Sequence, residues 1–204
     1  MITTKKMRNI VAQIAEVDQK FIPIIESSEL CELGRFESEM SHFESLVSSV
    51  ISQQLATSAA RTIKNNFKST VGRVTPKNVA RLEQNELRAA GLSNAKTRAI
   101  QGLALASLDG SIKFERLHDD SDELVYQKLT SLWGIGPWTV DMFMMFQLGR
   151  LDIWPTGDLG VRRGWEEIHR MRKEITPNDL QRAGAKFRPH RSVVAWYCWR
   201  ATDK

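Results

Sequence analysis

The chain has 204 residues, a formal net charge of +5 and two cysteines. This length suffices to bury a full core as one or two packed subdomains, and two thiols exclude a four-thiolate cluster and a disulfide framework. No run approaches the ~20 apolar residues that span a bilayer, and the N-terminus lacks the apolar core of a secretory signal. We therefore expect a soluble intracellular protein without an iron–sulfur cluster, in which Cys31 and Cys198 are small buried hydrophobes. The basic charge permits a polyanion partner.

Helical spacing of apolar residues dominates the chain from its start. The stripe of the first expected helix runs from Ile10 to Phe21, and Pro23 is expected to end this helix. Two further stripes cover residues 43–51 and 59–67, and the polar pair Gln53-Gln54 separates them.

Later helices are marked mainly by their ends. Thr75 and Thr176 each precede a proline, which is typical of an N-cap followed by proline in the first turn. Gly91 is expected to end one helix and Ser93 to cap the next. Apolar residues then lead into a hairpin and continue beyond it as far as Phe146.

No segment shows sustained period-two alternation, so the sequence predicts an all-α fold of about ten helices in two packed subdomains. We expect one domain over residues 1–204. Its central helical subdomain covers residues 43–150 and includes the hairpin at residues 129–147. A terminal bundle is expected from residues 1–42 together with residues 151–204.

The hairpin is the most informative stretch and reads LTSLWGIGPWTVDMF from residue 129. A Gly-x-Gly turn, Gly134 to Gly136, lets the backbone come close to a ligand. Pro137 then opens a helix whose free amides suit a phosphate. The same residues also make an ordinary corner between two helices, so the local sequence leaves both interpretations open.

Asp158 lies in a loop rich in glycine and proline, directly before an expected helix over residues 159–168. One role for it is the N-cap of that helix, worth about 1 kcal/mol. The other is chemical, because a fixed carboxylate beside a sugar C1′ stabilises the oxocarbenium character that develops when an N-glycosidic bond breaks. It can also orient or deprotonate water. The two roles are compatible, and Asp152 is the alternative carboxylate.

Four blocks in order resemble the helix-hairpin-helix DNA glycosylases, most closely the alkylpurine, or 3-methyladenine DNA glycosylase II, branch. They are FESLVSSVISQQLATSAA (residues 43–60), GLSNAKTRAI (91–100), GIGPWT with the later DLGVRRGW, and RPHRSVVAWYCWR (188–200). The resemblance implies a base-excision repair enzyme that flips alkylated purines, such as 3-methyladenine and 7-methylguanine, out of double-stranded DNA and releases them by hydrolysis. It implies a monomer that requires no cofactor and acts in the bacterial cytoplasm or the eukaryotic nucleus. The β-rich N-terminal domain of some relatives is expected to be absent.

The resemblance also assigns roles to residues of this chain. The catalytic aspartate of the family falls on Asp158, and Gly157 stands where close relatives carry a second acidic residue that we take to be non-catalytic. Trp138 and Trp199, with Trp154, are the expected base-pocket residues, because aromatic faces hold a flipped, positively charged base. Core packing is the alternative for each tryptophan, and Trp196 and Tyr197 are further candidates.

DNA binding is expected from the loop before residue 57 and from the hairpin. Gln54 is the expected wedge that fills the gap left by the flipped nucleotide, with Leu55 as the alternative. The full set of expected DNA-binding residues is Gln53, Gln54, Gly134, Gly136 and Trp138. A structural Na⁺ or K⁺ is expected on the backbone carbonyls of Thr130, Leu132 and Ile135.

The sequence leaves two other functions open. A bifunctional glycosylase/lyase for oxidised bases needs a lysine amine for a Schiff base, but Trp138 occupies the expected position and no lysine lies between Lys128 and Lys173. A non-catalytic module would use the hairpin only to hold phosphates.

Overall fold

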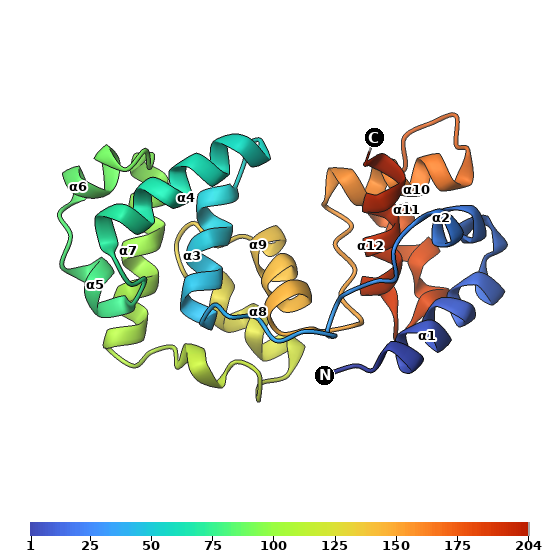
Figure 1. The fold of residues 1–204 in the computed structure, drawn as a ribbon, viewed down its shortest axis with the longest axis horizontal. Coiled ribbons are helices and arrows are strands. Elements are labelled where there is room, and N and C mark those ends of the chain that lie inside the picture. Colours follow the sequence, from blue (N-terminus) through green and yellow to red (C-terminus); the bar gives the residue numbers. More distant parts are fainter. Residues whose placement is uncertain (204) are drawn as a thin grey trace. The chain divides into compact units, whose positions relative to one another are not determined.

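The computed structural model describes residues 1–203, with every side chain in that range except that of Thr57. Over these residues the chain forms twelve α-helices, three 3-10 segments and one π-helical turn, and no strand (Figure 1). The predicted all-α fold class is confirmed, with two helices more than about ten. The chain divides into two compact units, residues 38–143 and residues 1–37 with 144–204.

The first unit is built around the central helix α7, which has 15 residues. Its helices are α3 (His42–Ser52), α4 (Thr57–Val71), α5 (Pro76–Ala80), α6 (Gln84–Ala89), α7 (Asn94–Leu108), α8 (Asp122–Thr130) and α9 (Pro137–Met142). α7 packs against α5 and α3, and Leu46, Ile100 and Leu103 are fully buried in this core. Thr75 and Ser93 accept hydrogen bonds as the N-caps of α5 and α7, as the sequence predicts.

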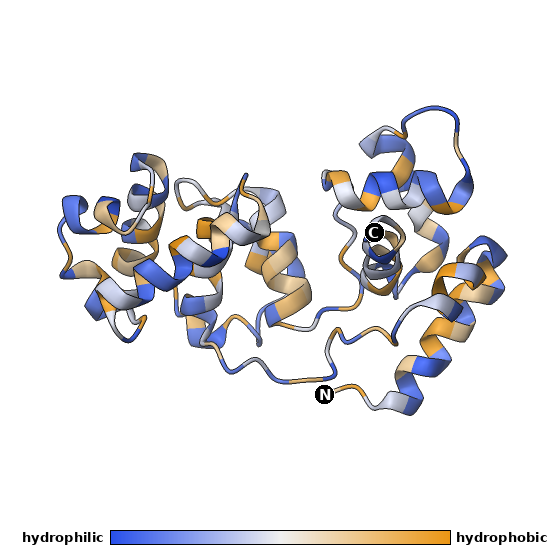
Figure 2. Cartoon of the chain, turned by 45° about the horizontal axis from the view of Figure 1, so that its top comes forward, coloured by the Kyte–Doolittle hydropathy of each residue, from blue (hydrophilic) through white to orange (hydrophobic). Residues whose placement is uncertain are grey.

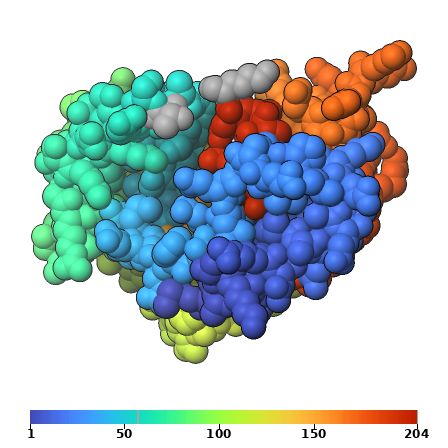
Figure 3. Space-filling view, turned by 45° about the vertical axis from the view of Figure 1, so that its right-hand side comes forward, coloured from blue at the N-terminus to red at the C-terminus, as the bar shows by residue number. Residues whose placement is uncertain are grey.

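The second unit is made of the two ends of the chain. Its helices are α1 (Thr4–Val17), α2 (Ile22–Ser27), α10 (Leu159–His169), α11 (Pro177–Gly184) and α12 (Arg191–Thr202). α10 and α12 form its main contact, and α2 also packs on α12. In Figure 3 red atoms of α12 are visible beside the blue N-terminal residues, which include α2. Cys31 and Cys198 are buried free thiols, as expected.

Glycines in α10 explain how closely α10 and α12 approach each other. A Cβ added at Gly164 would lie 1.8 Å from the carbonyl oxygen of Cys198, so any larger residue would force the two helices apart. Gly160 lies one turn earlier and faces Trp199 of α12. The two glycines therefore form one small-residue face on which α12 rests.

The first predicted helix end is wrong. α1 ends at Val17, and Pro23 lies inside the first turn of α2 rather than after a helix. Asp18 breaks the helix because its backbone is extended and its side chain accepts the amide of Lys20, which starts a 3-10 segment. Proline is tolerated in a first helical turn. Apolar and polar residues alternate along α1 in Figure 2, as one buried face requires.

The helix after the hairpin also differs from the expectation. α9 ends at Met142, and Phe143–Gln147 form a π-helical turn instead of continuing it. Phe143 and Met144 are buried, whereas Phe146 is 54% exposed. The wider turn changes the direction of the side chains that follow it. No helix of the described residues is long and apolar enough to cross a membrane.

Candidate functional site

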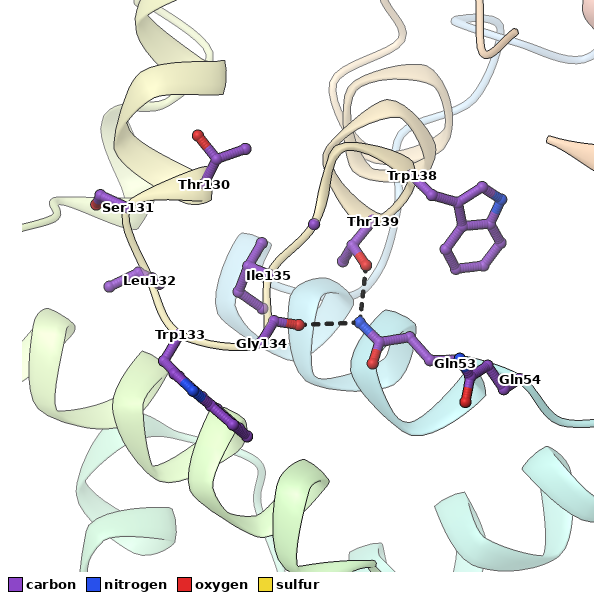
Figure 4. A pocket seen from close by; sticks show the side chains of 11 residues that line it. Gln53, Gln54, Thr130, Ser131, Leu132, Trp133, Gly134, Ile135, Trp138 and Thr139 are labelled. Carbon is purple, nitrogen blue, oxygen red and sulfur yellow. Dashed lines mark hydrogen bonds between the residues drawn. The ribbon is translucent and has the colours of Figure 1, made fainter. Parts of the chain in front are cut away.

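The hairpin between α8 and α9 borders an open hollow of about 850 Å³ (Figure 4). Its lining residues are Gln53, Gln54, Thr130, Ser131, Leu132, Trp133, Gly134, Ile135, Gly136, Trp138 and Thr139. The α3–α4 loop thus borders the same hollow as the hairpin, and the structure brings together all the DNA-binding residues that the sequence predicts.

Gly134 explains the shape of the hairpin. Its φ is +79°, a left-handed conformation that favours glycine, and a Cβ there would lie 2.8 Å from the Cβ of Ala99. The turn therefore lies directly on α7. Gly136 is the N-cap of α9 without a side-chain cap, and Pro137 follows in the first turn. Because the two glycines carry no side chains, a ligand in the hollow can approach the backbone of the turn.

Gln53 and Gln54 have different surroundings although they are neighbours. The Gln53 side-chain amide donates to the Thr139 hydroxyl at 2.9 Å and to the Gly134 carbonyl at 3.2 Å (Figure 4). Gln54 is exposed and has a φ of +55°. Gln53 therefore ties its loop to the hairpin, while Gln54 presents its side chain to solvent. Leu55, the alternative wedge, is also exposed.

Two tryptophans stand on different sides of the hollow in Figure 4. Trp138, predicted for the base pocket, is 37% exposed. Trp133 is 48% exposed, and the guanidinium of Arg98 lies 4.3 Å from the centre of its ring. The sequence does not identify Trp133 as a site residue. One feature of the sequence could have indicated it: Trp133 is a large aromatic residue directly before the Gly-x-Gly turn, where a buried position is not expected.

Asp158 is the N-cap of α10, as its first predicted role requires. Its Oδ1 accepts the backbone amide of Val161 at 2.9 Å and the indole Nε1 of Trp199 at 2.9 Å. A Cβ at Gly160 would lie 2.8 Å from Cδ1 of Trp199. The glycine after Leu159 is therefore what allows the indole to reach the carboxylate.

An aromatic stack adjoins this carboxylate within the same unit. Phe146 stacks on Trp199 with ring centres 5.6 Å apart and planes inclined by 30°. The sequence placed Phe146 only in the stripe of a continuing helix, because a π-helical turn has no reliable sequence signal. Phe146 thus joins the residues around Asp158 without having been predicted there.

Other candidate residues are engaged within the protein. Asp152 accepts Nε of the buried Arg191 at 2.7 Å and its Nη2 at 2.9 Å, which favours a structural ion pair over chemistry. Trp154 is 8% exposed, and its Nε1 donates to the Leu180 carbonyl at 2.9 Å. This geometry favours core packing for Trp154 over the expected place in a base pocket.

The residues expected to hold a cation, Thr130, Leu132 and Ile135, all line the hollow. The Leu132 carbonyl accepts the amide of Ile135 at 3.2 Å, and a carbonyl oxygen has a second lone pair for a ligand. Among the described residues, no cluster of three or more His, Cys, Asp or Glu side chains could hold a metal. A cation at the hairpin would therefore be held by backbone oxygens, which are ligands that hard cations accept.

Comparisons with known proteins show which family the chain resembles. Residues 47–189 match the family described as HhH-GPD superfamily base excision DNA repair protein. DNA-3-methyladenine glycosylase 1 of Schizosaccharomyces pombe is 35% identical over 167 residues, which cover 78% of this chain and 72% of that protein. A solved DNA-3-methyladenine glycosidase from Bacillus halodurans superposes with a TM-score of 0.82 and 32% identity, over 96% of this chain and 89% of that chain. A 3-methyladenine DNA glycosylase of S. pombe, solved in complex with abasic DNA, gives a TM-score of 0.78 and 30% identity, over 90% and 89% of the two chains.

Proposed function

The chain belongs to the HhH-GPD superfamily of base excision DNA repair proteins, and on this premise we propose that it is a monofunctional DNA glycosylase that releases alkylated purines. The substrate class is supported by relatives named 3-methyladenine glycosylases. One observation carries the chemistry: the Asp158 carboxylate is fixed at the start of α10 by two hydrogen bonds to a single oxygen, next to an aromatic stack.

The chemistry follows from the charge of the substrate. A purine alkylated at N3 or N7 is a cation, so it leaves readily with the electron pair of its bond to C1′. Positive charge then develops on the sugar, and the preorganised carboxylate of Asp158 stabilises it. Water adds to C1′ and gives up a proton, which Asp158 is suited to accept. The products are a free base and an abasic sugar in an intact strand.

Aromatic faces are suited to hold such a base, because their quadrupole attracts a cation by about 0.5–2 kcal/mol. We assign this role to Trp199, whose indole contacts Asp158 within the same unit. Trp138, in the other unit, is a separate candidate for the same role. Phe146 stacks on Trp199 and supports its ring. Histidine is not needed as a general acid, because the alkylated base already carries the charge that makes it leave.

DNA is the partner in this proposal, and the hairpin backbone holds it by phosphates rather than by base edges. Gln54, exposed at the rim of the hollow, fills the gap in the duplex that the flipped nucleotide leaves. The backbone carbonyls of Thr130, Leu132 and Ile135 would hold a Na⁺ or K⁺, which would supply positive charge for a phosphate. The protein acts as a monomer, in the cytoplasm of a bacterium or the nucleus of a eukaryote.

A base-release assay tests this function. Duplex DNA methylated with a radiolabelled alkylating agent is incubated with the protein, and free 3-methyladenine and 7-methylguanine are separated by chromatography. Wild-type protein should release labelled base, whereas Asp158→Asn should bind the DNA and lose most of the release, because the amide keeps the cap but not the charge. Asp203→Asn is the matched control, since it removes an exposed carboxylate at the end of α12. Equal release by both variants would return Asp158 to a purely structural role.

A further inference from the structure

The α3–α4 loop (residues 53–56) holds a residue in an unfavourable backbone conformation. Gln54 has a φ of +55°, a left-handed region that residues with a Cβ rarely adopt. Such a conformation persists only where the surrounding structure fixes it, and it is found preferentially at functional positions. Contacts of the residues around Gln54 are therefore expected to hold it in this conformation.

Lys96 holds this loop from the side of α7. Its ammonium group donates to the Ile51 carbonyl at 2.8 Å and to the Gln53 carbonyl at 2.9 Å. These carbonyls lie at the C-terminal end of α3, where the last oxygens have no partner within the helix and the dipole favours a cation. Burial lowers the pKa of Lys96, because partial removal from water disfavours the charged ammonium group.

Gln53 fixes the same loop from the side of the hairpin. Its side-chain amide donates to the Thr139 hydroxyl and the Gly134 carbonyl, and Thr139 is buried. Gln53, directly before Gln54, is thus held at two points. Lys96 binds its backbone carbonyl, and Thr139 of α9 and the Gly134 carbonyl bind its side chain. Neither contact touches the Gln54 side chain, which remains exposed.

We infer that Lys96 is a positioning residue, which holds the α3–α4 loop so that Gln54 is already raised as the wedge before DNA binds. This inference rests on the proposed function for the role of Gln54. A preformed wedge loses little conformational freedom when it enters the duplex, so binding energy is available to extrude the nucleotide. Lys96 acts through the backbone and not on the substrate.

A direct phosphate contact is the competing role for a lysine at this place. Two of the three ammonium hydrogens of Lys96 already point to protein carbonyls. A lysine that neutralised a phosphate would contribute to the dependence of binding on salt, and its loss would reduce the log–log slope by about one. Positioning predicts an unchanged slope.

A double-mutant cycle measures the proposed coupling. Lys96→Met keeps the aliphatic stem and removes the ammonium, and Gln54→Ala removes the wedge. Single-turnover base release should fall about tenfold or more in either single variant, while the double variant should be little slower than Gln54→Ala alone, because the two residues serve one function. Lys77→Met on α5, which removes an exposed charge, should match wild type. Losses in Lys96→Met and Gln54→Ala that multiply in the double variant, or a salt slope reduced in Lys96→Met, would overturn the inference.

Hydrogen exchange separates this inference from the function on which it rests. In Lys96→Met the amides of Gln53 and Leu55, which bond to Val50 and Ser52, should exchange faster than in wild type, while those of residues 45–50 should not change. Lys96→Arg should restore protection, since a guanidinium donates to two carbonyls. Unchanged exchange in Lys96→Met would overturn the positioning role even in an active enzyme. Absence of base release by the wild-type protein would instead refute the proposed function, and the exchange data would still decide whether Lys96 holds the loop.

Discussion

The indole of Trp199 donates to Oδ1 of Asp158 at 2.9 Å, so the last turns of α12 orient a carboxylate at the start of α10. The amide of Val161 occupies the same oxygen. One tryptophan therefore has two functions: its nitrogen fixes the carboxylate, and its ring stacks on Phe146. The indole nitrogen and the ring of Trp199 can therefore be tested separately, the first for orienting Asp158 and the second for holding a base.

Trp199→Phe should lower base release about tenfold or more, because it removes a hydrogen bond to a charged group, worth about 1.5–3 kcal/mol, and keeps an aromatic ring. Affinity for an abasic duplex should stay close to that of wild type. Single-turnover release and a fluorescence binding titration measure the two effects. Trp196→Phe is the control on the same helix, since Trp196 contacts Tyr197 and Arg200. Equal losses of release in both variants would mean that packing of α12, and not the hydrogen bond, is responsible.

Gly160→Ala should reduce base release and destabilise the protein by about 1–3 kcal/mol, because the new Cβ would overlap the ring of Trp199. The indole must move, and its hydrogen bond to Asp158 is lost with it. Gly157→Ala is the matched control, because a Cβ there meets nothing within 4 Å and its φ is not positive. Urea unfolding and base release of the two variants test the prediction. A Gly160→Ala protein as active as Gly157→Ala would show that the indole has room to move without loss.

The sequence predicts these elements unequally. It identifies Asp158 as a cap and the Gly-x-Gly turn, because glycine, proline and capping residues act locally. It does not predict Lys96 or Phe146 as parts of a site. Lys96 acts through two backbone carbonyls at the end of another helix. Because every residue has a backbone carbonyl, the sequence does not show which carbonyls bind a lysine. Phe146 takes its direction from a π-helical turn.

Tertiary contacts also override the local signal in places. Trp154 lies in the same loop as Asp158, a loop that contains glycine and proline. Its indole nevertheless packs against Gly184, where a Cβ would lie 2.3 Å from Nε1. The sequence predicts that Pro23 ends the first helix, but the helix ends before Asp18. The Asp18 side chain also forms hydrogen bonds with His169 and Lys186. Distant partners of this kind cannot be read from spacing along the chain.

Trp138→Ala should reduce release of 3-methyladenine more than it reduces binding to an abasic analogue. The analogue has no base to stack, so only the aromatic contact with the base should disappear. Release kinetics and binding titrations on the two duplexes give the comparison. Trp133→Ala is the control, because Trp133 lines the same hollow but carries Arg98 on its ring; it should affect both duplexes alike. Equal losses on both duplexes for Trp138→Ala would assign its ring to support of the hairpin.

Asp18 should make stability depend on pH in the acid range. Burial acts to raise the pKa of Asp18, but hydrogen bonds from Lys186 and His169 outweigh it and lower the pKa from 3.8 to about 2. A lowered pKa in the folded state contributes stability above the unfolded value, and this contribution is lost as pH falls toward about 2. Asp18→Asn should therefore cost about 1–2 kcal/mol at pH 6, allowing for screening by water, and little at pH 2. Urea unfolding at a series of pH values measures the difference, and a cost that does not change with pH would contradict the prediction.

The enzyme should release its base and leave the sugar–phosphate strand intact. Strand cleavage by β-elimination proceeds through an imine, which requires a nucleophilic amine at C1′. The family resemblance predicts that Trp138 occupies the position where lyases carry that amine, and an indole nitrogen cannot attack a sugar. No lysine lies between Lys128 and Lys173, and the Lys128 ammonium is paired with Asp120 at 2.6 Å. Water is then the nucleophile that remains.

Incubation with methylated duplex should therefore give strand breaks only after alkali or heat, because the product is an abasic site. Borohydride, which reduces an imine to a stable amine, should trap no covalent complex of protein and DNA. A lyase assayed in parallel supplies the positive control for trapping. A strong trapped adduct would contradict a monofunctional mechanism. Lys128→Gln and Lys173→Gln would then identify the amine, and disappearance of the adduct in one of them would place the nucleophile.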